Sequence, residues 1–192
     1  GSRYPTVSSA GNANQSAGVS ATTIYTVNPA SQSITCTKLG AGIAGSTVTV
    51  NATATSGLAV AFASTTSVVC TVSGSTATLI TTGSCSITAS QPGNANYSAA
   101  APVTQVFTVN PSIQMITFAN PGPAAFGSAV TLVATSTSGL AVGFASNTTR
   151  VCTVVGTSVT FLTTGSCSIT ARQPGTATYS AAQPVTHAFH VD

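Results

Sequence analysis

The stretch from Thr81 to Ala89 reads TTGSCSITA, and the same nine residues return unchanged from Thr163 to Ala171. Within it, the apolar residues Cys85, Ile87 and Ala89 alternate with serine and threonine. A period of two is typical of a β-strand with one face toward a core, because successive side chains point to opposite faces. The recurrence at an offset of 82 residues indicates two copies of one structural unit.

The repeat extends over most of the chain, since residues 32–109 align with residues 114–191 without a gap. Each copy contains several short segments in which apolar and polar residues alternate, separated by glycine, proline, serine and asparagine. Valine, isoleucine and threonine, which are frequent here, favour strands over helices. We therefore predict an all-β protein of tandem immunoglobulin-like β-sandwich domains, at residues 31–111 and 112–192, with about seven antiparallel strands each.

The N-terminal segment, residues 1–30, resembles the last strand of a preceding repeat. Two motifs recur at the same offset: GNAN at 11–14 and 93–96, and TVNP at 26–29 and 108–111. Upstream of them, Arg3 and Pro5 stand where Cys85 and Ile87 stand in the first full copy. Proline lacks the N–H that a central strand needs, so we expect that residues 1–10 do not preserve the strand before the last one.

This segment supplies one last strand more than the two full copies require. Its inward positions are Val19, Ala21, Tyr25 and Val27. One interpretation is strand donation, in which residues 18–29 pair with a sheet edge of another copy and build a head-to-tail fibre. The other is that the chain is a segment of a longer array, with residues 1–29 belonging to a neighbouring domain.

Charged residues make up only 3% of the chain. The cations Arg3, Lys38, Arg150 and Arg172 are scattered, and Asp192 is the only acidic side chain. Nucleic-acid binding needs clustered lysine and arginine, so we do not expect it. No apolar run approaches the length of a membrane span, so we do not expect membrane insertion.

Four of the five cysteines form two equivalent pairs. Cys70 and Cys85 are 15 residues apart, as are Cys152 and Cys167, and all four occupy inward positions. A zinc site needs four ligands, which one pair without a nearby histidine or carboxylate does not supply. We predict a disulfide in each domain and, because disulfides persist in oxidising compartments, a secreted or cell-surface protein.

The fifth cysteine, Cys36, has Phe118 as its counterpart in the second copy. We interpret it as a buried free thiol that acts as a small apolar residue. The alternative is a disulfide between two copies of the chain.

Catalytic groups are scarce. A glycosidase needs two carboxylates, and the chain has one side-chain carboxylate. His187 and His190 lie on opposite faces of the last predicted strand, so they cannot point at one ligand. We predict no catalytic residue, no metal site and no cofactor, and therefore a protein that is not an enzyme.

The repeat resembles the bacterial immunoglobulin-like repeats of large surface proteins and invasin/intimin-type adhesins. The resemblance covers residues 31–192 and rests on GLAVAF at 57–62, VCTVSG at 69–74 and GSCSITA at 83–89. It differs from the common versions by lacking tryptophan and by carrying the cysteine pair. The resemblance implies a surface stalk or fibre whose partners are neighbouring repeats or other copies of itself.

Two other functions remain open from the sequence. An adhesive module would recognise a glycan or protein ligand, for which Tyr97 and Tyr179 are candidate stacking residues, although a repeated tyrosine is more often structural. An accessory domain of an enzyme is the third interpretation.

Overall fold

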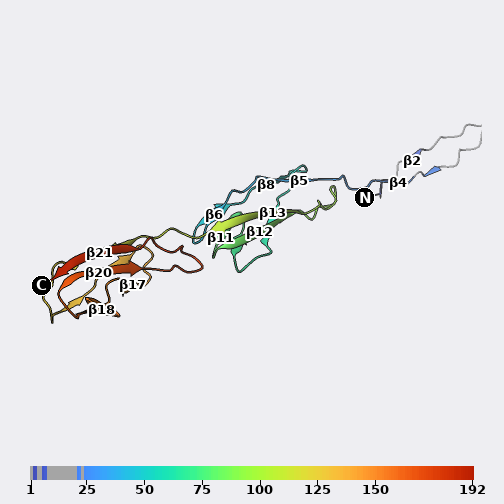
Figure 1. The fold of residues 1–192 in the computed structure, drawn as a ribbon. Coiled ribbons are helices and arrows are strands. Elements are labelled where there is room, and N and C mark those ends of the chain that lie inside the picture. Colours follow the sequence, from blue (N-terminus) through green and yellow to red (C-terminus); the bar gives the residue numbers. More distant parts are fainter. Residues whose placement is uncertain (1, 4–5, 8–20, 23) are drawn as a thin grey trace, which may run out of the picture.

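The computed structural model describes residues 2–3, 6–7, 21–22 and 24–192, and this part of the chain forms strands and loops without a helix. Figure 1 shows an N-terminal hairpin followed by two β-bodies placed end to end, with the C terminus at the far end. We call β5 to β13 the first body and β14 to β21 the second body. The distal end of a body is the one farther from the hairpin, and the proximal end is the one nearer to it.

No helix among the described residues is long and apolar enough to cross a membrane.

The first body has two main sheets and a short strand pair. One sheet has the order β6 (Gly42–Ile43), β13 (Val103–Asn110), β12 (Gly83–Ser90) and β9 (Ala61–Ser64). The other has the order β10 (Cys70–Ser73), β11 (Thr76–Leu79) and β7 (Thr47–Thr49). The pair is β5 (Ile34–Cys36) with β8 (Ala52–Ala54). Only β6 runs parallel to its neighbour among these strands, so the body is an antiparallel sandwich.

The second body repeats this arrangement at the predicted offset. Its sheets are β17 (Gly143–Ser146), β20 (Gly165–Arg172) and β21 (Val185–Val191), and β15 (Ala129–Thr131), β19 (Ser158–Phe161) and β18 (Cys152–Val155). The short pair is β14 (Ile116–Phe118) with β16 (Ala134–Ser136). A single parallel bridge from Ala124 to Val191 stands where β6 pairs in the first body. The predicted fold class, an immunoglobulin-like β-sandwich, is confirmed.

One predicted strand divides between two sheets. Residues 47–54 keep their apolar–polar alternation, but β7 pairs with β11 whereas β8 pairs with β5. The change occurs at Val50 and Asn51: the Val50 N–H donates to the Ser75 carbonyl at 2.8 Å, and the Asn51 carbonyl accepts from Thr37 N at 2.9 Å. The segment crosses from one layer to the other while the same side chains continue to face the core.

The N-terminal hairpin preserves more of the repeat than the sequence suggested. It consists of β1 (Ser2–Arg3), β2 (Thr6–Val7), β3 (Ala21–Thr22) and β4 (Tyr25–Thr26). Its pairs Ser2–Thr26 and Thr6–Thr22 are the counterparts, at an offset of 82, of Ser84–Thr108 and Thr88–Thr104. The expectation that residues 1–10 lose the preceding strand is therefore wrong for 2–3 and 6–7, because backbone pairing tolerates the changed side chain at position 3.

Candidate functional site at the junction of the two bodies

Ser112 ties the two bodies together. It follows β13 and forms a parallel bridge with Tyr179 of the second body: its N–H donates to the Thr178 carbonyl at 2.8 Å, and its carbonyl accepts from Ser180 N at 2.9 Å. Its side-chain Oγ donates to the Ala44 carbonyl of the first body at 2.9 Å. One residue thus fixes the linker to both bodies.

A second contact crosses the junction between two loops. The hydroxyl of Thr81 and the N–H of Thr82 both donate to the carbonyl of Ala177, at 3.0 and 3.1 Å. None of these groups is charged, so their strength does not depend on salt as that of an ion pair does. Each neutral hydrogen bond contributes about 0.5–1.5 kcal/mol. The junction is therefore a small set of directional contacts that fixes an orientation.

A buried glutamine pair shapes the loop that contains Ala177. Gln114 Nε2 donates to Gln173 Oε1 at 2.6 Å and to the Ser180 carbonyl at 2.7 Å, and Gln173 Oε1 also accepts from Gly175 N. Both glutamines are buried, and no buried side-chain polar atom in the described part of the chain lacks a partner. The first body repeats this network with Gln32, Gln91 and Gly93.

Sequence reasoning missed this network because glutamine is usually a surface residue. The available signal was the recurrence of the Gln-Pro-Gly motif at 91–93 and 173–175 together with Gln32 and Gln114. Glycine is required after the proline: Gly175 has a φ of 84°, and a Cβ there would lie 2.4 Å from the Tyr179 carbonyl oxygen. The motif therefore encodes a tight turn that presents the Ala177 carbonyl to the neighbouring body.

The two disulfides lie inside the bodies and not at the junction. Cys70 on β10 is joined to Cys85 on β12, and Cys152 on β18 to Cys167 on β20, with S–S distances of 1.94 and 1.98 Å. In each body the bond links the two facing sheets, and all four residues are fully buried. A bridge that closes a loop of this size contributes about 3 kcal/mol in the chain-entropy model.

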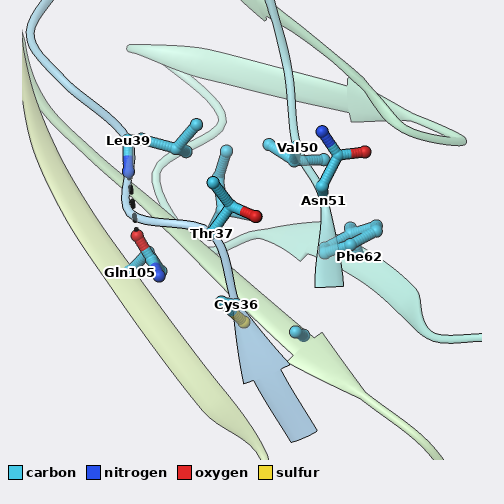
Figure 2. A pocket seen from close by; sticks show the side chains of 9 residues that line it. Cys36, Thr37, Leu39, Val50, Asn51, Phe62 and Gln105 are labelled. Atoms are coloured by element: carbon cyan, nitrogen blue, oxygen red, sulfur yellow. Dashed lines mark hydrogen bonds between the residues drawn. The ribbon is translucent and has the colours of Figure 1, made fainter. Parts of the chain in front are cut away.

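Cys36 is a free thiol at the end of β5 and is only partly buried. Figure 2 shows it beside a small cavity of about 10 Å³, which is also lined by Phe62 and by Gln105, whose Oε1 accepts from Leu39 N at 3.2 Å. Desolvation by the surrounding residues raises the pKa of the thiol above its usual value of 9.0. The cavity has room for about one water molecule and is no ligand pocket.

The histidines and tyrosines that the sequence singled out do not converge. His187 is half-buried, with Nε2 3.0 Å from the Phe118 carbonyl, whereas His190 is exposed and lies 3.3 Å from Asp192 Oδ1. Tyr97 and Tyr179 lie in different bodies at equivalent positions, where each pairs its backbone with the incoming linker. Among the described residues, no group of three or more His, Cys, Asp or Glu is placed to hold a metal ion.

The candidate strand-donation segment pairs within its own chain. Ala21 is opposite Val7 and Tyr25 is opposite Arg3, so one edge of this strand is already occupied. Val27 follows β4 and is exposed, and Val19 lies outside the described residues.

Comparisons with known proteins bear on the fold alone. No protein-family model and no curated protein matches the chain. Among solved structures, mouse protocadherin-24 EC1-3 is 13% identical with a TM-score of 0.39, and the match covers 99% of this chain and 79% of that one. The D00-D0 domain of intimin is 17% identical with a TM-score of 0.32, and the match covers 81% of this chain and 98% of that one.

Drosophila N-cadherin EC1-4 is 9% identical with a TM-score of 0.30, over 100% of this chain and 58% of that one. TM-scores and identities this low carry no argument about function. The sheet order, the facing layers and the disulfide between them identify both bodies as immunoglobulin-like β-sandwiches.

Proposed function

We propose that this chain is a structural segment of an extracellular stalk or fibre, in which hydrogen bonds hold successive bodies in a fixed orientation. The observation that carries the proposal is the junction: Ser112 and the Thr81–Thr82 pair bind across it without any charged group. A stalk must transmit position from one end to the other. A junction held by hydrogen bonds at Ser112 and at the Ala177 carbonyl supports that role better than a loose linker does.

The composition and the disulfides support an extracellular location. Two disulfides that link the facing sheets suit an oxidising compartment. A single side-chain carboxylate in the whole chain gives little basis for acid–base or calcium chemistry, and we propose a role that is not enzymatic. The partners that fit this role are neighbouring repeats and other copies of the chain.

We place the domain boundaries at equivalent residues, 30–111 and 112–192. Ala30 makes the same contacts with the first body that Ser112 makes with the second: its N–H donates to the Asn96 carbonyl at 2.8 Å, and its carbonyl accepts from Ser98 N at 2.9 Å. This moves the predicted boundary at residue 31 by one position.

Small-angle X-ray scattering tests the stiffness of the junction. We expect the double variant Thr81→Val/Ser112→Ala to keep both bodies folded but to broaden their relative orientations and shorten the mean particle length. Thr163→Val, compared at a concentration at which the chain is monomeric, is the matched control, because Thr163 is the counterpart of Thr81 and is exposed. A chelator should leave the wild-type curve unchanged. Identical scattering from the wild type and the double variant would contradict the proposal that these hydrogen bonds fix the orientation of the two bodies.

A binding role is the second candidate, and one feature favours it. An open groove of about 570 Å³ runs beside β17, the edge strand of its sheet, and is lined by Val142, Phe144, Arg172 and Pro174. An exposed strand edge beside an apolar groove suits a peptide that adds to the sheet. Arg172→Ser places serine at this position, as the first body has at the equivalent Ser90. This variant should then abolish capture of ligands found on a peptide or glycan array. Unchanged capture would argue against this groove.

A further inference from the structure

The distal end of the second body carries the groups that form the junction at the distal end of the first. Thr163 and Thr164 are the counterparts of Thr81 and Thr82, with the same identities. Thr81 and Thr82 are half-buried against the second body, whereas Thr163 and Thr164 are exposed. Within the described part of the chain, neither the Thr163 hydroxyl nor the Thr164 N–H donates to any group, although their counterparts both bind the Ala177 carbonyl.

The same end exposes apolar side chains. Phe126 is 57% exposed, whereas its counterpart Ala44 is 2% exposed and belongs to the core of the first body, with its carbonyl accepting from Ser112 at the junction. Leu162, beside Thr163, is 49% exposed, but its counterpart Ile80 is still 45% exposed beside the complete junction, so this position lies outside the contact. Phe126 and the two unused donors give this end both apolar area and directional groups, which is the usual make-up of an interface.

The proximal end of the first body carries the complementary group. Ala95 is the counterpart of Ala177 and lies in the same turn: Asn94 N donates to the Tyr97 carbonyl at 2.9 Å, as Thr176 N does to Tyr179. Ala95 is exposed, and among the described residues its carbonyl accepts no backbone or side-chain donor. The described residues therefore hold one complete junction and, on the outer faces of the two bodies, groups equivalent to those that form it.

We propose that the distal end of the second body binds the proximal end of the first body of a second copy, so that copies associate head to tail. The inference rests on the proposed function, because it uses the same junction contacts between separate chains. The two surfaces differ, so the interface is heterologous and does not close, and such contacts propagate into filaments. Binding is weak, because Ala30 lacks the hydroxyl of Ser112 and no linker raises the local concentration.

The N-terminal hairpin opposes this docking. Its register is that of β12 and β13, and it leads into Ala30 as β13 leads into Ser112, so it is the counterpart, at the first body, of β20 and β21 of an incoming body. Docking therefore requires the hairpin to swing about residues 27–29. End docking therefore requires that the hairpin move aside, whereas strand donation requires that the hairpin be present.

Sedimentation velocity of the full chain, over a concentration series that reaches the millimolar range, tests the proposal. We expect concentration-dependent growth, weakened roughly tenfold or more by Phe126→Ser, because aromatic anchors supply much of the binding energy of interfaces. Thr163→Val should weaken it a few-fold through loss of one hydrogen bond. Val155→Ser is the control: Val155 is 81% exposed at the opposite end of the β18–β19 pair and should change nothing.

Deletion of residues 1–26 distinguishes end docking from strand donation. End docking predicts stronger association of the truncated chain, whereas strand donation predicts its loss; both bodies keep their own cores in this variant. A monomer at every concentration, or equal association of the wild type and Phe126→Ser, would overturn end docking. Either of these results would leave the proposed function untouched, because the stiffness of the internal junction is measured on monomers.

Discussion

The two bodies have the same backbone arrangement, but their hydrophobic cores are organised differently. The second body has one continuous hydrophobic cluster of twelve buried residues, which includes Phe118, Phe161 and Ile169. In the first body the buried residues form a cluster of nine around Leu79 and a cluster of three around Ile34, and the half-buried Phe62 packs against both. Strand register and disulfides are equivalent in the two bodies, so the same frame tolerates a core that is divided into fully buried clusters. A few inward side chains decide its continuity.

The aromatic ring of Phe118 distinguishes the core of the second body from that of the first. Its ring centroid lies 5.3 Å from Phe144 and 5.0 Å from His187, and its carbonyl lies 3.0 Å from His187 Nε2. The first body has Cys36 in place of Phe118 and Gln105 in place of His187, and the cavity of about 10 Å³ lies between them. We infer that the first body is the less stable of the two and unfolds first on heating.

Removal of the disulfides tests this ranking with the largest expected effect. Cys70→Ala/Cys85→Ala should lower the free energy of unfolding of the first body by about 3 kcal/mol, because the unfolded chain regains loop entropy. Cys152→Ala/Cys167→Ala should do the same to the second body. Calorimetry should show the first variant shifting the lower transition and the second variant shifting the upper one. The reverse assignment would contradict the ranking.

Phe118→Cys converts the second body toward the first. We expect a loss of about 2 kcal/mol, less than for a full truncation to alanine because the sulfur keeps part of the packing. Urea unfolding should place the variant transition close to that of the first body. Phe126→Ala is the matched control, because Phe126 is mostly exposed and has alanine as its counterpart, so it should change stability little. Equal losses from both variants would contradict the role of Phe118.

The sequence predicted the fold from two features that do not depend on tertiary detail. Alternation such as Cys85, Ile87 and Ala89 identified strands, and the offset of 82 residues identified the repeat. Alternation could not show that residues 47–54 divide between two sheets, because the inward side chains stay inward when the chain changes layer. Side-chain identity also misled at Arg3, because ladder hydrogen bonds join backbone groups.

The junction could not be predicted from the sequence in the same way. The bond from Ser112 Oγ to the Ala44 carbonyl depends on the relative orientation of two bodies, which no periodicity reports. The buried Gln114–Gln173 pair had a signal in the repeated Gln-Pro-Gly motif, but glutamine is too often exposed for that motif to predict burial.

His187→Gln tests the contact between His187 and Phe118, with a smaller expected effect. The substitution introduces the first-body residue Gln105 and removes the tilted ring pair with Phe118, so we expect a loss of about 1 kcal/mol from the second body. The effect should become smaller in the Phe118→Cys background, because the ring contact is then absent while the backbone carbonyl of residue 118 still lies beside His187 Nε2. A double-mutant cycle by urea unfolding measures this coupling. Independent, additive losses would show that His187 acts elsewhere.

The smallest expected effect is a dependence on alkaline pH that only the first body shows. Desolvation raises the pKa of Cys36 above 9.0, so the folded state binds its proton more tightly than the unfolded chain does. The resulting stability is complete below pH 9.0 and is lost as the pH rises through the folded-state pKa. The unfolding free energy of wild type relative to Cys36→Val should therefore be constant at neutral pH and fall above pH 9.0.

Comparison with Cys36→Val cancels the titration of tyrosines and lysine, which both proteins share. The second body, with Phe118 at this position, should show no such difference between the two proteins. An unchanged difference between pH 7 and pH 10.5, measured by urea unfolding, would mean that water reaches Cys36 freely. The cavity beside it would then be open to solvent, and the division of the first core would reflect exposure of β5 and not the missing aromatic ring.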